Sequence, residues 1–369
     1  MPDNILFYLV FLSQIILISF YFPGKILERV RYVVEKYPPS EYPKLYPVSL
    51  DKIEKGQRTF RNMNLLILFA GLVLVVLGFL SGYSPTESED GIFLTFYFMV
   101  QFSPMMVAEF SGFKYFKLMR KANSPTTRKA QLQPRRLFDF VSSTLFGLAV
   151  LLYFAFVFFV LYIYQFEFHP ESKAFINIIT LTVCNLFFAG IIAWNMYGKK
   201  LNPHQAHKDR MQQIKLTVKS LVLISIAATL FLAIAVIFDN LDSDKLMPLA
   251  MCLYFQLLAV ISFQSMTPVL QIDNTDFDVY KAEPGAKISD FVSEDGTETE
   301  KRLLLFAGIG LALGLSFGVF LGFKEGATIV GMALIGGIAG VIGMVLGIAL
   351  ACLLNFRKGT SSNQESLVK

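Results

Sequence analysis

Long apolar stretches alternate with shorter polar segments along the chain, and this alternation is its dominant pattern. The nine apolar stretches cover residues 5–22, 64–82, 92–113, 144–166, 174–197, 216–238, 246–265, 303–323 and 327–355. A helix that crosses hydrocarbon about 30 Å thick needs about 20 apolar residues, which is close to the length of most of these stretches. Inside lipid each backbone amide must be paired within its own segment. The pattern therefore predicts an all-α, polytopic transmembrane helix bundle of about nine spans.

The composition supports the same class. Of 369 residues, 54% are hydrophobic, only 17% are charged and 37 are Phe. Soluble domains have about 45–50% apolar and about 25% charged residues. The composition therefore excludes an ordinary soluble enzyme, a disordered chain and a disulfide-stapled secreted domain. We expect an integral protein of a plasma membrane, of the bacterial inner-membrane type.

Lysine and arginine are distributed unequally between the two sides of the predicted spans. One side carries 29 of them, in the segments 23–63, 114–143, 198–215 and 266–302 and in the C-terminal tail. The other side carries three, namely Lys173, Lys245 and Lys324. Because short loops rich in Lys and Arg stay in the cytoplasm, this distribution predicts an N-terminus outside and a C-terminus in the cytoplasm.

The net charge of +5 follows from these loops. Their basic residues are spread along helix ends and include no groove-binding motif, so the charge does not indicate a nucleic-acid partner. Basic segments beside a membrane attract anionic lipid headgroups. We therefore expect the lipid bilayer and its anionic headgroups as partners, and no nucleic acid.

The spans and loops form one domain in this interpretation. A single transmembrane domain covers 1–356, and a cytoplasmic tail covers 357–369. The basic loop 23–63 starts with apolar residues at helical spacing, which predicts an amphipathic helix at the membrane surface, and continues as a Tyr-Pro-rich linker. The segment 266–302 is acidic and polar and is expected to be a partly disordered cytoplasmic linker.

Two parts of the chain resemble each other weakly. Lysine and glutamine lie five and ten residues after a proline in both, as Lys52 and Gln57 after Pro47 and as Lys208 and Gln213 after Pro203. Transporters are often built from repeated halves. The match suggests a repeat of 1–166 in 174–323, although chance similarity between apolar helices explains it nearly as well.

Amides mark the middle of alternate spans. Gln14, Gln101, Asn185 and Gln256 lie near the midpoints of the first, third, fifth and seventh spans. An amide at this depth lacks water and must find another partner. Together the four could line a cavity for a small neutral or zwitterionic solute, or each could bond a neighbouring helix. Because uncharged amides form a poor path for ions or protons, the second interpretation is favoured for their role.

Glu109 is the acidic residue inside a predicted span, about one turn from the cytoplasmic end of the third span. Ionisable residues within a membrane indicate function by default. Its shallow position also allows a structural pair, for example with Lys219 of the sixth span. Glu109 is therefore included with the four amides as a candidate for substrate binding.

The last two spans are rich in glycine at four-residue spacing. Glycines clear one face of each helix, so that a neighbouring backbone can approach closely. The packing glycines are Gly310, Gly314, Gly318, Gly322, Gly336, Gly340, Gly343 and Gly347. We expect a tightly packed antiparallel hairpin, and a homo-oligomer or another membrane partner as an alternative use of the same face.

The sequence offers no catalytic set. Ser316 lies in a Gly-x-Ser-x-Gly pattern, but a nucleophile needs a base, and the histidines His169, His204 and His207 all lie in predicted loops. His204 and His207 have no cysteine partner nearby for a zinc site. We expect no enzyme, cofactor or metal. The leading hypothesis is transport or permeation of a small neutral or zwitterionic solute, and the alternative is a membrane scaffold or regulatory subunit assembled through the glycine-rich helices.

Overall fold

Every regular element of the described residues is a helix. The computed structural model describes residues 2–83, 88–122, 135–198, 202–265 and 275–281, which all belong to the compact unit Met1–Val292. The spans expected at 303–323 and 327–355 lie outside these residues, together with their packing glycines and the tail 357–369.

The helices of the described residues follow the predicted spans closely. The first three form one continuous rod of α1 (Pro2–Ile16), the π-helix η1 (Leu17–Tyr21) and α2 (Phe22–Lys36). The other long helices are α3 (Leu50–Ser81), α4 (Ser88–Ala122), α5 (Ser143–Ile163), α6 (Lys173–Tyr197), α7 (His207–Asn240) and α8 (Met247–Ser265). Each of the seven spans expected between residues 5 and 265 coincides with one of these helices.

Five of these helical segments are long and apolar enough to cross a membrane. They are Ile5–Lys36, Leu50–Leu80, Ser143–Ile163, Lys173–Tyr197 and His207–Asn240. The outward face of α3 illustrates their surroundings, because Leu66, Phe69 and Leu80 are 72%, 70% and 76% exposed. A soluble protein rarely exposes such a continuous apolar face. The chain is therefore an integral membrane protein.

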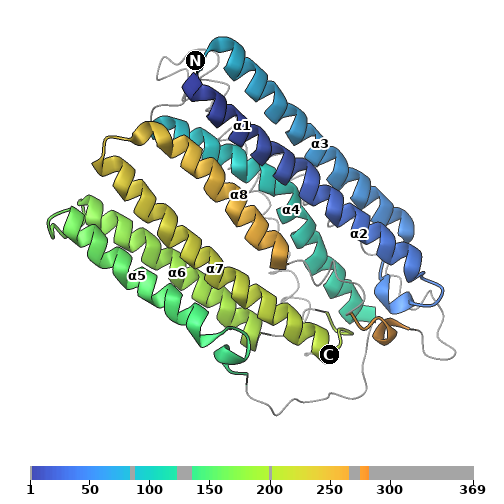
Figure 1. Cartoon of the computed structure of the whole chain (residues 1–369). Helices are drawn as coiled ribbons and strands as arrows, with labels where there is room; N and C mark the ends of the chain where they lie inside the picture. The colour runs from blue at the N-terminus through green and yellow to red at the C-terminus, as the bar shows by residue number, and fades with distance from the viewer. Residues whose placement is uncertain (1, 84–87, 123–134, 199–201, 266–274, 282–369) are drawn as a thin grey trace, which may run out of the picture. The chain divides into compact units, whose positions relative to one another are not determined.

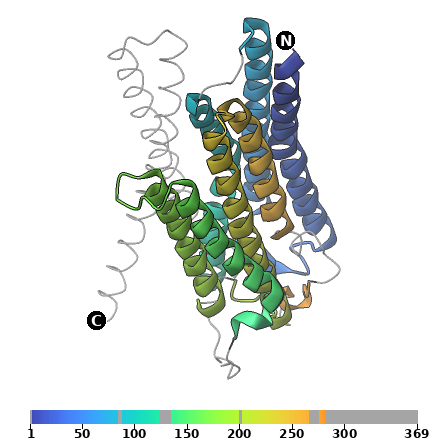
Figure 2. The ribbon, with the colours of Figure 1, turned by 60° about the vertical axis from the view of Figure 1, so that its left-hand side comes forward.

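The helices pack against one another in successive pairs (Figure 1). Helices α5 and α6 pack against α7, α7 packs against α8, and α8 contacts both α1 and α4. Helix α1 also packs against α3. Figure 2 shows α5 and α6 on the opposite side of α7 and α8 from α1 and α3. Helix α8 therefore joins two groups of helices, one made of α1 to α4 and the other of α5 to α7.

The sequence analysis placed an amphipathic helix at the membrane surface after the first span, and the structure corrects this prediction. Helix α2 continues α1 in one line instead of turning onto the membrane surface (Figure 1). The backbone at Ile16, Tyr21 and Phe22 keeps right-handed helical angles, so nothing turns the chain there. Phe22 and Leu27 are buried, and α2 packs along the first part of α3. Its apolar face thus packs at least partly against protein.

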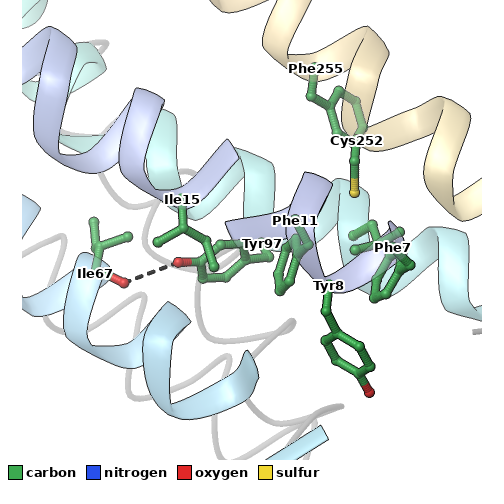
Figure 3. Packing of buried hydrophobic residues seen from close by; sticks show 9 residues of the cluster. Phe7, Tyr8, Phe11, Ile15, Ile67, Tyr97, Cys252 and Phe255 are labelled. Atoms are coloured by element: carbon green, nitrogen blue, oxygen red, sulfur yellow. Dashed lines mark hydrogen bonds between the residues drawn. The ribbon is translucent and has the colours of Figure 1, made fainter. Parts of the chain in front are cut away.

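An aromatic core fills the space between α1, α3, α4 and α8 (Figure 3). Phe11 of α1 meets the ring of Tyr97 of α4 edge to face, with ring centres 5.4 Å apart. Cys252 of α8 is fully buried in the same cluster, as expected for a cysteine that packs as a small apolar residue. Tyr97 also donates a hydrogen bond from Oη to the backbone oxygen of Ile67 on α3, at 3.1 Å. This core fixes the helices that carry three of the four candidate amides.

Residues far apart in sequence form a cap where α2 and α4 end and α7 begins. We call this cluster the aromatic cap, and it consists of Tyr37, Tyr42, Met119, Phe277 and Tyr280. The rings of Tyr37 and Phe277 stack with centres 3.9 Å apart, and Asn202 Nδ2 donates to Tyr280 Oη at 2.6 Å. Burial raises the pKa of Tyr280 to about 12. Residues 275–281, which we expected within a partly disordered linker, are thus folded onto the bundle.

Substituting Phe277 with alanine is expected to loosen the aromatic cap. The variant loses the stack with Tyr37, and removing a buried aromatic ring costs about 3–5 kcal/mol. Segment 275–281 would then open more often, so that trypsin cleaves after Lys281 at least about tenfold faster. Limited proteolysis with mass spectrometry measures the rate. The matched control is F138A, which truncates an exposed phenylalanine outside the cap, and equal rates for both variants would contradict the described packing.

Candidate functional site

Two of the candidate amides bond directly to each other inside the bundle. Gln14 of α1 donates from Nε2 to Oε1 of Gln101 on α4, at 2.8 Å. Gln101 donates in turn from Nε2 to Oγ of Ser19, at 3.2 Å. The three side chains are 0%, 1% and 2% exposed. We call these three residues the amide network.

The π-helix explains how Ser19 joins Gln14. Ser19 follows Gln14 by five positions, and an α-helix would turn their side chains roughly 140° apart. The wider turn of η1 reduces this rotation, which brings Ser19 onto the side that faces Gln101. An α-helical pattern therefore gives no signal for Ser19, and the sequence analysis missed it.

Helix α4 is also irregular beside the amide network. Pro104 lies within α4, three residues after Gln101, and it has no N–H to donate to the backbone oxygen of Val100. Ser103 Oγ donates to that oxygen instead, at 2.8 Å. Two weakened places in the helical backbone, η1 and Pro104, thus flank one buried hydrogen-bonded network. Such irregularities occur often at functional sites and hinges.

One atom of the amide network is unsatisfied. Gln14 Oε1 is buried and has no hydrogen-bond partner among the described residues. A buried polar atom without a partner costs about 1–3 kcal/mol, so such atoms call for an explanation. The unpaired oxygen can accept a hydrogen bond from a solute or a water molecule.

Gln256 lies on α8 beside α1 but bonds elsewhere. It donates from Nε2 to the backbone oxygen of Val10 at 3.1 Å, and its Oε1 accepts from Ser13 Oγ at 3.2 Å. Ser13 is exposed and Gln256 is half-buried. Gln256 thus contacts α1, the helix that carries Gln14, on an adjacent face of α1. It forms no hydrogen bond to the amide network.

Asn185 is separate from the other three amides. Its Oδ1 accepts a hydrogen bond from Ser225 Oγ at 2.6 Å, which links α6 to α7. This pair lies in the group of α5 to α7, whereas the amide network lies between α1 and α4. The geometry of Asn185 is that of a bond between two neighbouring helices.

Glu109 is exposed on α4. Among the described residues it forms no ion pair with Lys219, which is also exposed on α7. Glu109 lies two turns beyond Gln101 and is not part of the amide network. Within the described residues, no group of three His, Cys, Asp or Glu side chains is placed to hold a metal ion.

A cleft of about 510 Å³ opens beside the amide network, between α2 and α3. Ser19 lines its inner end, and Asn64 of α3 lines it nearby. Charged side chains of both signs, such as Glu28 and Arg61, line the rest. Ser19 therefore belongs both to the buried network and to the wall of the cleft. The sequence analysis did not single out Asn64, because an amide at the first residue of a span is an ordinary boundary residue.

Comparisons of this chain with family models, with curated proteins and with solved structures found no match.

Proposed function

We propose that this protein transports, or allows the permeation of, a small neutral or zwitterionic solute. The amide network is the solute-binding region in this proposal, and the cleft at Ser19 is its entrance. Gln14 Oε1 carries the argument, because it is a buried acceptor without a hydrogen-bond partner among the described residues. It lies next to the two irregular helices α1–η1 and α4. Transporters commonly place discontinuous helices around a binding site in the middle of the membrane.

The proposed path needs a movement beyond Ser19. The cleft ends at Ser19 and does not include Gln14 or Gln101 among its lining residues. A solute would reach them when η1 and the part of α4 at Pro104 move apart, since the backbone has fewer regular helical bonds there. Amide and hydroxyl groups then offer both donors and acceptors to a neutral or zwitterionic solute, and no ionisable side chain of the amide network attracts free ions.

The topology belongs to the same proposal. We propose nine spans in a plasma membrane of the bacterial inner-membrane type, with the N-terminus outside and the C-terminus in the cytoplasm. The arrangement of the loops supports it, because the aromatic cap joins the α2–α3 loop to the end of α4 and to segment 275–281. These segments, which the sequence analysis placed on the cytoplasmic side, thus meet at one end of the helix bundle. We further propose that the protein has no enzymatic activity and that its basic loops contact anionic headgroups.

Uptake into proteoliposomes tests the proposed function. The purified protein is first screened for thermal stabilisation by uncharged and zwitterionic solutes, and radiolabelled forms of the stabilising solutes are then used for uptake. The variant Q14L/Q101L, which removes both amides, is expected to lose uptake at least about tenfold, since each lost bond to a solute costs about 0.5–1.5 kcal/mol. The matched control N185L/S225A removes a similar amide–hydroxyl pair between α6 and α7 and is expected to retain uptake.

Two results would contradict the proposal. Equal uptake by wild type and Q14L/Q101L would remove the amide network from the path. Absence of stabilisation and uptake for every solute tested would favour the alternative of a scaffold or regulatory subunit. Cross-linking in native membranes would then show a homo-oligomer or a co-purifying partner.

A further inference from the structure

The cleft between α2 and α3 has a graded lining that the proposed transport does not require. It follows one face of η1 and α2 from Ser19 to Glu35, a distance of about 24 Å at 1.5 Å per residue. The inner part is lined by apolar side chains, including the exposed Phe20 and Leu65. The outer part is lined by Glu28, Arg31, Glu35 and Arg61. A compact solute would fill only part of a cleft of this length and polarity.

The charges of the outer part are available for a ligand. Arg31, Arg61 and Glu35 form no ion pair among the described residues, and Glu28 pairs only with Lys25 at the surface, at 3.0 Å. Arginine binds phosphate oxygens in a planar, two-pronged geometry. Carboxylates accept hydrogen bonds from a primary ammonium group. The cleft thus offers binding groups for both a phosphate and an ammonium group.

Asn64 supplies a second, independent observation. The residue is 2% exposed, it lines the cleft, and its Nδ2 donates to the backbone oxygen of Phe60 at 2.8 Å. Its Oδ1 is buried without a hydrogen-bond partner among the described residues. This oxygen can only accept, so it requires a donor from outside. Arg61 lies one turn before Asn64 on α3, which places a phosphate-binding group and an acceptor on the same side of the helix.

We propose that the cleft binds an ethanolamine glycerophospholipid. The phosphodiester contacts Arg31 and Arg61, the ammonium group donates to Asn64 Oδ1 and to the carboxylate of Glu28, and an acyl chain lies along the apolar inner part. A choline headgroup has no N–H to donate and is usually held by several aromatic faces. Tyr32 is the single aromatic residue at the charged end of the described lining. This inference rests on the cleft and does not depend on transport. A lipid bound there would occupy the proposed entrance at Ser19 and would have to leave it before a solute enters.

The test measures lipid binding to the delipidated full-length protein in detergent. Native mass spectrometry counts bound dioleoyl phosphatidylethanolamine, phosphatidylcholine and phosphatidylglycerol, and thermal unfolding reports stabilisation. We expect at least about tenfold tighter binding of the ethanolamine lipid than of the choline lipid, because the ammonium hydrogen bonds are lost with choline. Free phosphoethanolamine is included as the soluble source of the same headgroup.

Variants separate the cleft from general lipid binding. R31Q/R61Q removes two exposed charges, and it is expected to weaken binding of the ethanolamine lipid at least about tenfold. The control R58Q removes an exposed arginine of α3 that pairs with Glu54 outside the cleft, and it is expected to bind as wild type does. N64L is expected to lose the preference for ethanolamine, whereas N64D retains the acceptor and the preference, which keeps the test valid if N64L folds poorly.

Three outcomes would overturn the inference. These are equal binding of all three lipids, unchanged binding by R31Q/R61Q, and competition by free phosphoethanolamine as strong as by the lipid, which would assign a soluble ligand to the cleft.

Discussion

Replacing Gly71 with alanine is expected to lower the thermal stability of the protein markedly, although the change adds one methyl group. An added Cβ on Gly71 would overlap Tyr97 Oη and would lie 3.1 Å from Ile15 Cδ1. Tyr97 is 4% exposed, and its hydroxyl group bonds to Ile67 of α3 (Figure 3). The ring therefore has little space to move. Overpacking of this kind costs about 1–3 kcal/mol, and G71L should cost more.

A double-variant cycle tests the cause of this loss. Y97F removes the oxygen that the new methyl group would meet, so G71A/Y97F should lose less stability than the sum of the two single variants. The control G56A lies on the same helix, where an added Cβ meets nothing within 4 Å. Thermal unfolding followed by circular dichroism provides the midpoints. An unchanged midpoint for G71A, or strict additivity in the cycle, would show that Tyr97 does not lie against Gly71.

Substituting Gln101 with leucine is expected to destabilise the protein more than the corresponding change at Gln14. Gln101 accepts from Gln14 and donates to Ser19, so Q101L leaves the Nε2 of Gln14 buried without a partner. That loss costs about 1–3 kcal/mol. Q14L removes a side chain whose Oε1 already lacks a partner among the described residues, which offsets part of its cost. The double variant Q14L/Q101L should therefore be more stable than Q101L alone.

The order of the stabilities, together with uptake, distinguishes a packing role of the two amides from a solute-binding role. If the amides only joined helices, the apolar double variant would keep both its stability and its uptake. If they bind a solute, the double variant regains stability and still loses uptake. Chemical unfolding of the four proteins in the same detergent measures the order. A double variant that is less stable than Q101L would mean that the bond between Gln14 and Gln101 is not the main partner of either side chain.

The helices of this protein could be predicted from the sequence because lipid imposes a simple rule. Each apolar stretch from 5–22 to 246–265 became a helix, since no other structure pairs its backbone inside a membrane. The amides Gln14 and Gln101 were found for the same reason, because a polar group in lipid must have a partner.

Other features depend on contacts that local patterns do not contain. Ser19 reaches Gln101 through a π-helix, and hydrophobic periodicity does not reveal the extra residue in its turn. Phe277 reaches Tyr37 across most of the chain, so composition alone indicated a linker. Asn185 lies near the middle of α6, but its position along the helix does not specify which helix an amide faces, and Asn185 bonds Ser225 instead of the other amides.

The unequal lengths of the helices have a consequence for the surrounding bilayer. Helix α8 has 19 residues, which span about 28 Å, while the 32 residues of α3 span about 48 Å. If α8 crosses a hydrocarbon layer of about 30 Å, its described residues leave no surplus, whereas α3 can tilt or extend beyond such a layer. In a thicker bilayer, hydrophobic mismatch would fall on α8 first, beside the exposed Ser13 and half-buried Gln256. Acyl-chain length would then act directly on the helix that joins the two groups of helices.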